Sequence, residues 1–244
     1  MRKGIKQEIL QRIFALYRYW FDDKEFACTR GCSACCTRNV MVTALEGELV
    51  VSHVRKKSWQ KWLAGQLTSR GNTVCHLTMN EWAEQCISGN YPGEDPGSDS
   101  LEPCQFLAAD YSCSIYEARP FACRCFASLI PCRESGTASQ PRDLLAINTV
   151  VMQIIEHLDQ GEIYGSLGNI LTALCNREEY NDIAVFLPSR LRHDINIHNG
   201  LRRARPLPGL VTESEDRAAV RLFIEILFQE KINDKSLQYL LNHG

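Results

Sequence analysis

The chain of 244 residues carries 27 Lys and Arg against 29 Asp and Glu, which gives a formal net charge of −2. Its 45% hydrophobic and 23% charged residues are the balance of a globular protein, and the length suits a single domain over residues 1–244. The near-neutral charge argues against nucleic acid as a partner. No stretch approaches the roughly 18 uninterrupted apolar residues of a membrane helix, so we expect no membrane partner.

The N-terminal segment lacks the pattern of a secretory signal, because charged residues such as Lys6 and Arg12 interrupt any hydrophobic stretch. This predicts a cytoplasmic, reducing location, in which cysteines act as core residues, reactive thiols or metal ligands. Eleven of the twelve cysteines lie between Cys28 and Cys132. Such clustering favours a functional role over that of small hydrophobic residues scattered through a core.

The first half of the chain predicts three helices. Apolar residues recur at three- and four-residue steps near the N-terminus, and two capping boxes follow, Thr43 to Glu46 and Thr78 to Glu81. Directly before the first box, Asn39 to Val42 indicates a short extended piece. The predicted helices cover residues 4–21, 43–54 and 78–87, with loops over 28–36 and 88–103.

The last hundred residues show helical periodicity with little interruption. An apolar stripe from Leu144 to Leu158, closed by Gly161, predicts one helix, and a second follows over 167–174. Residues 188–210 hold three prolines and five arginines, which predicts an exposed connection. A further capping box, Thr212 to Glu215, predicts the start of a last helix that ends near Gln229.

Alternation with period two is scarce, so the predicted fold class is mainly α with little β structure. We expect a single helical domain built around a cysteine-rich metal-binding module over residues 28–132. Residues 143–244 form its C-terminal helical part.

The cysteines form two dense groups with the spacing of metal ligands. Short spacings such as C-x2-C let one turn point several sulfurs at one centre, and soft thiolates suit zinc, iron or iron–sulfur clusters. Neighbouring Cys35 and Cys36 point different ways, which suits a two-metal site, or one ligand plus one free thiol. The groups are Cys28-x3-Cys32-x2-Cys35-Cys36 and the set Cys104, Cys113, Cys123, Cys125 and Cys132.

The isolated cysteines and the nearby arginines have simpler interpretations. Cys75, Cys86 and Cys175 are predicted to be core thiols. Arginines flank both dense groups, where a guanidinium can donate to a sulfur, although an ordinary surface position is the competing interpretation. They are Arg30, Arg38, Arg119, Arg124 and Arg133.

The two groups together resemble the CxxxCxxCC family, a zinc- or iron-chelating domain. The resemblance rests on C-x3-C-x2-C-C at 28–36, on Pro103-Cys104-x-Phe-Leu, and on Cys113-Ser-Ile-Tyr-Glu-x-Arg-Pro-x-x-Cys123-Arg. It covers the chain from Cys28 to Phe126 and leaves Cys125 and Cys132 outside the pattern. The implied metal ligands are Cys28, Cys32, Cys35, Cys36, Cys104, Cys113 and Cys123, and the implied cofactor is zinc or iron, including a [4Fe-4S] cluster.

The resemblance also implies that Tyr116, Arg119 and Pro120 shape the site, against ordinary core packing for Tyr116. The Arg119-Pro120 pair interrupts any helix, which turns Cys123 back toward Cys113.

Three functions are compatible with such a cluster. The first is chelation of zinc or iron by the thiolates. The second is a cluster-dependent transferase or redox enzyme, because flagellin lysine N-methylases share this signature. In that case the thiols not used as metal ligands, at Cys35, Cys36 and Cys125, are candidates for the chemistry. The third is a non-catalytic, metal-stapled module that binds a protein partner. The sequence leaves open whether the protein is an enzyme.

Two sharper enzyme interpretations have weaker support. Cys28, Cys32 and Cys35 have the spacing of the radical S-adenosylmethionine motif, but that fold needs repeated strand–helix units that the sequence lacks. Thiol–disulfide exchange at Cys35-Cys36 or Cys123-x-Cys125 lacks the βαβ context of thioredoxin-like proteins.

Overall fold

The long helices form where the sequence shows helical periodicity, and the predicted mainly α class is confirmed. The computed structural model describes residues 1–29, 31–67, 74–93, 102–192, 199–213 and 215–243. The helices of seven or more residues are α1 (Lys3–Trp20), α2 (Ala44–Lys56), α3 (Gln60–Gln66), α4 (Met79–Ile87), α7 (Arg142–Leu158), α8 (Leu167–Cys175), α12 (Arg217–Gln229) and α13 (Leu237–His243). Shorter helical turns are η1 (Tyr116–Ala118), α5 (Phe121–Arg124), α6 (Cys132–Ser135), η2 (Glu178–Tyr180), α9 (Asn181–Ala184) and α10 (Ser189–Arg192).

Two of the three predicted capping boxes are present. In α2 the Thr43 hydroxyl accepts from the Glu46 backbone N–H at 3.3 Å, and the Glu46 carboxylate accepts from the Thr43 N–H at 3.0 Å. The Thr78 box of α4 is built in the same way. Each box satisfies backbone donors that the first helical turn leaves without intrahelical partners.

The third predicted capping box is wrong. Helix α12 begins only at Arg217, and its N-cap residue Asp216 makes no side-chain cap. The acidic side chains upstream face another helix instead, since Glu213 and Glu215 each lie 2.8 Å from the Arg142 guanidinium. The ion pairs with the first residue of α7 thus replace the local cap.

A small antiparallel sheet joins three distant parts of the chain. Its order is β1 (Met41–Thr43), β2 (Ile163–Ser166) and β3 (Leu201–Arg203), with Val42 opposite Gly165 and Tyr164 opposite Arg202. The predicted extended piece near Val42 is confirmed in part. The prediction of an exposed connection over 188–210 is confirmed for most of its described residues, but the segment also forms α10 and β3 and buries Ala204; residues 193–198 lie outside the described residues. Strands this short show no period-two signal.

A second, two-stranded ladder follows α12. It pairs β4 (Lys231–Ile232) with β5 (Lys235–Ser236), and the two residues between them, Asn233 and Asp234, have positive φ angles of 50° and 63°. Asn and Asp tolerate this conformation, which a tight hairpin turn requires.

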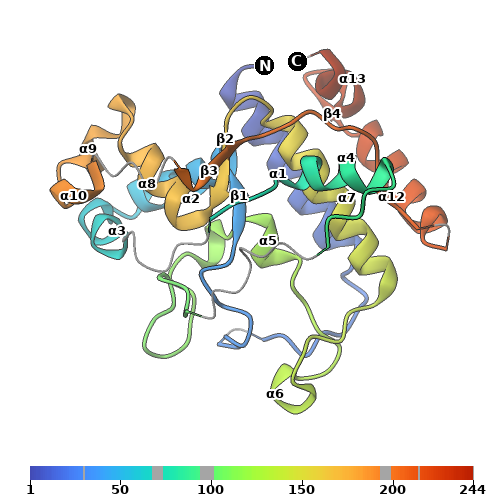
Figure 1. The fold of residues 1–244 in the computed structure, drawn as a ribbon, viewed down its shortest axis with the longest axis horizontal. Helices are drawn as coiled ribbons and strands as arrows, with labels where there is room; N and C mark the ends of the chain where they lie inside the picture. The colour runs from blue at the N-terminus through green and yellow to red at the C-terminus, as the bar shows by residue number, and fades with distance from the viewer. Residues whose placement is uncertain (30, 68–73, 94–101, 193–198, 214, 244) are drawn as a thin grey trace.

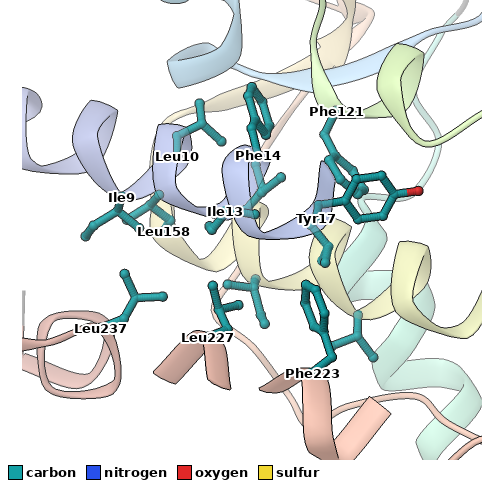
Figure 2. Close-up of a cluster of buried hydrophobic side chains, with 14 of the residues drawn as sticks. Ile9, Leu10, Ile13, Phe14, Tyr17, Phe121, Leu158, Phe223, Leu227 and Leu237 are labelled. Atoms are coloured by element: carbon teal, nitrogen blue, oxygen red, sulfur yellow. The ribbon is translucent and has the colours of Figure 1, made fainter. Parts of the chain in front are cut away.

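The larger hydrophobic core lies between α1, α7 and α12 (Figure 1). In Figure 2, Leu158 of α7 lies close to Ile9 of α1, Phe223 and Leu227 of α12 lie on one side of α1, and the Phe14 ring projects from the opposite side. Phe121 of α5 joins the same core, with its ring 4.8 Å from Tyr17 and 6.1 Å from Phe14. The short helix α5 is thereby fixed to the helical body.

A second core lies between α2 and α8 and includes their contacts with the sheet. The two helices approach closely at Gly47, where an added Cβ atom would lie 2.7 Å from Ile170 Cγ2 and 2.8 Å from Leu174 Cδ1. None of the helices in the described part of the chain is long and apolar enough to cross a membrane.

Candidate metal centre

The cysteine-rich loops gather on one side of the helical body. In Figure 1 the segment before β1, the green loops that precede α5 and the short helix α6 occupy the lower part of the view, and α5 lies near its centre. All twelve cysteines fall within the described residues and are free thiols. Loops of this kind can present sulfurs from several segments to one point.

Backbone hydrogen bonds bring Cys36, Cys104 and Cys113 onto neighbouring pieces of chain. The Cys104 N–H donates to the Cys36 carbonyl at 2.9 Å, next to an isolated bridge between Thr37 and Pro103. A second bridge pairs Leu107 with Cys113, and the Leu107 N–H donates to the Cys104 carbonyl at 3.0 Å. The contact between Cys36 and Cys104 joins two segments almost seventy positions apart in the sequence.

The fourth member of this set is Cys123, on α5. The chain breaks between η1 and α5 at Arg119 and Pro120, as the sequence predicts, and the Cys123 N–H donates to the Pro120 carbonyl at 3.1 Å. The first N–H of α5, from Phe121, donates to the buried Glu46 carboxylate at 2.7 Å. The same carboxylate that caps α2 therefore also holds the helix that carries Cys123.

Electrostatic coupling shows that these four thiols share one region. Burial raises the pKa of Cys123, and negative charge on Cys104 and Cys113 raises it further. The pKa of Cys36 responds in the same way to Cys104, Cys113 and Cys123. Like charges within a few ångströms oppose each other's ionisation, and a bound cation would relieve that repulsion. We call Cys36, Cys104, Cys113 and Cys123 the inner group.

Two backbone N–H groups are aimed at sulfurs of the inner group. The N–H of Phe106 donates to Cys104, and the N–H of Ile115 donates to Cys113; each contact lowers the pKa of its thiol. Hydrogen bonds to the charged form stabilise a thiolate, the state in which cysteine binds metals. The donor set therefore fits a soft cation, and an all-thiolate tetrahedral arrangement suits zinc or iron.

Two of the flanking arginines lie near these sulfurs. Arg119 stacks on the Tyr116 ring at 3.6 Å, and its charge lowers the pKa of both Cys113 and Cys123. The charge of Arg38 likewise lowers the pKa of Cys104. Four thiolates around a divalent ion leave a net charge near −2, which needs positive partners. The positions of Arg38 and Arg119 support the interpretation that arginines provide them.

Arg124 has a different role. Its guanidinium donates to the carbonyls of Arg119 at 2.6 Å and Glu117 at 2.8 Å, and it lies 4.6 Å from the Phe14 ring centroid. It holds the backbone of the turn in place. Arg30 lies outside the described residues.

Cys35 lies at the edge of the inner group. Its thiol hydrogen-bonds to the sulfur of Cys36, which raises the pKa of Cys35 and lowers that of Cys36. Cys36 is therefore the more readily ionised member of the pair. The remaining thiols of the first dense group, Cys28 and Cys32, are exposed and face a pocket that also contains Cys132.

The cysteines predicted to be core thiols divide into two kinds. Cys75 and Cys175 are buried, as predicted, and Cys75 donates to the Leu77 carbonyl at 3.2 Å. Cys86 on α4 is only partly buried. Cys125, a candidate for leftover chemistry, is buried against the α1–α7 core, and burial raises its pKa to about 12, which keeps it protonated and unreactive.

The thiols do not yet converge as a bound ion would require. Across the described residues, no three cysteine, histidine or acidic side chains already surround one point. Each sulfur can move by rotation about its Cα–Cβ bond between staggered positions. The backbone thus sets which cysteines share a site, and side-chain rotation would complete the coordination.

The fold and these thiols define a mainly helical protein with a loop-rich cysteine module. Residues 27–144 match the family model CxxCxxCC, "Putative zinc- or iron-chelating domain". The family resemblance expected from the cysteine pattern is therefore confirmed over this segment. Neither the curated proteins nor the solved structures include a match to the chain.

Proposed function

We propose that the protein binds one zinc or iron ion through the inner group, Cys36, Cys104, Cys113 and Cys123. The observation that carries this proposal is the backbone pairing that brings Cys36 beside Cys104 and Cys104 beside Cys113, with α5 adding Cys123. The family match over residues 27–144 supports metal binding in general. Four thiolates would complete a tetrahedral shell.

A closed shell of four thiolates favours a structural role. The four ligands come from segments far apart in the sequence, so the ion would contribute free energy of folding to the whole module. A catalytic ion usually keeps an open coordination position, which four protein ligands would fill. The proposal includes a cytoplasmic, reducing location, in which the thiols stay available.

The first experiment is to measure metal and acid-labile sulfide in the full-length protein purified without oxygen, together with its visible spectrum. We expect zinc or iron without sulfide. Iron with stoichiometric sulfide and a brown charge-transfer band would replace this proposal with a [4Fe-4S] cluster, and the transferase or redox interpretation would then become the leading hypothesis.

The ligand assignment is tested with Cys113→Ser, and Cys86→Ser serves as the control. Cys113 belongs to the inner group, whereas Cys86 lies on α4 at a partly buried position. We expect Cys113→Ser to lose the inner ion and Cys86→Ser to keep the full metal content. Equal metal content in both variants would show that the inner group is not the site.

A further inference from the structure

Three cysteines outside the inner group line one pocket. Cys28 and Cys32 come from the loop after α1, and Cys132 is the first residue of α6, about one hundred positions later. The pocket has a volume of about 240 Å³, and Arg133 also lines it. The family pattern in the sequence does not include Cys132, so only the tertiary structure places it here.

Specific backbone contacts hold the two walls of this pocket together. The Ala27 N–H donates to the Ser128 carbonyl at 2.8 Å, and the Ser128 N–H in turn donates to the sulfur of Cys28. Ser128 itself is buried, and its hydroxyl accepts from the Ser139 N–H at 2.9 Å and donates to the Ile130 carbonyl at 2.6 Å. The segment that leads to Cys132 is therefore tied to the segment that carries Cys28.

The loop itself is shaped for two closely spaced ligands. The Cys32 N–H donates to the Thr29 carbonyl at 3.0 Å, and Gly31 between them has a φ of 93°, which residues with a side chain rarely adopt. This tight turn returns Cys32 toward Cys28. An N–H donor on the Cys28 sulfur is the same device that serves Cys104 and Cys113 in the inner group.

Cys35 follows Cys32 by three residues in the same loop and, although it does not line the pocket itself, it is the candidate for a fourth ligand. Charges on Cys32, Cys35 and Cys132 all act on Cys28, which places each of these three thiols within electrostatic reach of Cys28. The Cys35 thiol is hydrogen-bonded to the sulfur of Cys36, the first member of the inner group. Rotation about the Cα–Cβ bond of Cys35 would turn its sulfur from Cys36 toward the pocket, while Cys36 serves the inner group.

We propose that Cys28, Cys32, Cys35 and Cys132 bind a second soft divalent ion, separate from the ion of the inner group. Its identity as zinc or ferrous iron rests on the function proposed above, whereas the division into two sites rests on the pocket. Arg133, which lines the pocket, balances part of the negative charge of four thiolates. The eight cysteines thus divide into two sets of four, with the Cys35-Cys36 pair at their junction.

The test is to load the reduced full-length protein with ¹¹³Cd²⁺ and to count bound ions by elemental analysis and by NMR resonances. We expect two ions and two separate signals from the unaltered chain. Cys132→Ser should remove one ion and one signal. Cys113→Ser should remove the other signal and leave the first in place.

Several results would overturn the second site. They are a single bound ion in the unaltered chain, or two ions in Cys132→Ser. The loss of both ions from either variant would also overturn it, because that result indicates one shared cluster. A chain that binds one ion, lost in Cys113→Ser but kept in Cys132→Ser, would refute only the second site. Metal loss confined to Cys132→Ser would instead refute the inner group.

Folding of the variants can be judged separately. No residue of α6 is buried, so Cys132→Ser leaves the hydrophobic core intact, and circular dichroism should show unchanged helix content. Cys28→Ser, at an exposed position on the opposite wall, should reproduce the loss of the same signal. If Cys28→Ser keeps both signals, the proposed ligand set is wrong.

Discussion

The Glu46 carboxylate connects the helical body to the loop that carries Cys123, and its removal is the sharpest test of this architecture. The carboxylate is buried and accepts hydrogen bonds from the Thr43 N–H at 3.0 Å and the Phe121 N–H at 2.7 Å. Glu46→Ala would leave both backbone donors without an acceptor. A buried unsatisfied donor costs about 1–3 kcal/mol, and removal of a buried carboxylate offsets part of this. We expect a net loss of about 2–4 kcal/mol in the free energy of unfolding.

The matched control is Glu81→Ala, because Glu81 forms the same capping box on α4 without a bond to the cysteine module. Glu81 caps Thr78 and pairs with Arg202 at 2.8 Å. Its replacement should cost about 1–2 kcal/mol, the sum of a cap and a partly exposed ion pair. Any larger loss of stability in Glu46→Ala then reflects the deeper burial of Glu46 and its contact with Phe121.

The assay combines urea unfolding with competition for zinc by a chromophoric chelator. Glu46→Ala should lower the affinity for the inner ion about tenfold, the order expected when a residue that orients a ligand is removed. Glu81→Ala should bind zinc as the unaltered chain does. Equal stability and equal zinc affinity in the two variants would refute the view that Glu46 positions Cys123.

Four further predictions follow from other parts of the structure. Cys123→Ser and Cys32→Ser should each lose metal and melt at a lower temperature; full metal content with an unchanged melting curve would contradict the ligand assignment. Because burial raises the pKa of Cys125 to about 12, iodoacetamide at pH 8 should modify it only after unfolding, and mass spectrometry that finds it modified as fast as exposed Cys28 would disprove its burial. Gly47→Ala should cost about 1–3 kcal/mol in urea unfolding because its Cβ would lie 2.7 Å from Ile170, whereas Gly65→Ala, with open space, should not destabilise; equal effects would refute the close α2–α8 packing. Burial raises the pKa of Asp159 to about 6, so the folded state binds the proton more tightly than the unfolded one, and this stabilisation is lost as pH rises from about 4 to 6. Over that range the unaltered chain should lose about 2–3 kcal/mol of its free energy of unfolding through Asp159, and Asp159→Asn should not show this loss. Parallel pH–stability curves for the two chains would contradict this prediction.

Local sequence patterns were sufficient for the helices. The apolar stripe from Leu144 to Leu158 and the two capping boxes at Thr43 and Thr78 each predict a helix that the structure contains. These signals succeed because a helix satisfies its backbone hydrogen bonds within one segment and buries one face. The predicted capping box at Thr212 does not form, because the acidic side chains beside it form ion pairs with Arg142 of another helix.

The sequence by itself also determined the chemistry of the cysteine module. The spacing from Cys28 to Cys36 and the string from Cys113 to Cys123 predict thiolate ligands, and the family match over residues 27–144 supports zinc or iron binding in general. Sequence spacing alone could not tell which sulfurs share a site, because that depends on contacts between segments far apart in the chain.

Only the tertiary structure decided those contacts. The pairing of Met41 with Ser166 and of Ile163 with Arg203 builds a sheet from strands too short to show alternation. In the same way, the bond between Ala27 and Ser128 places Cys132 beside Cys28, and Glu46 places α5. Local sequence patterns determine helices, because a helix forms its backbone hydrogen bonds within one segment. The cysteine sites and the short strands depend on partners from distant segments, which only folding brings together.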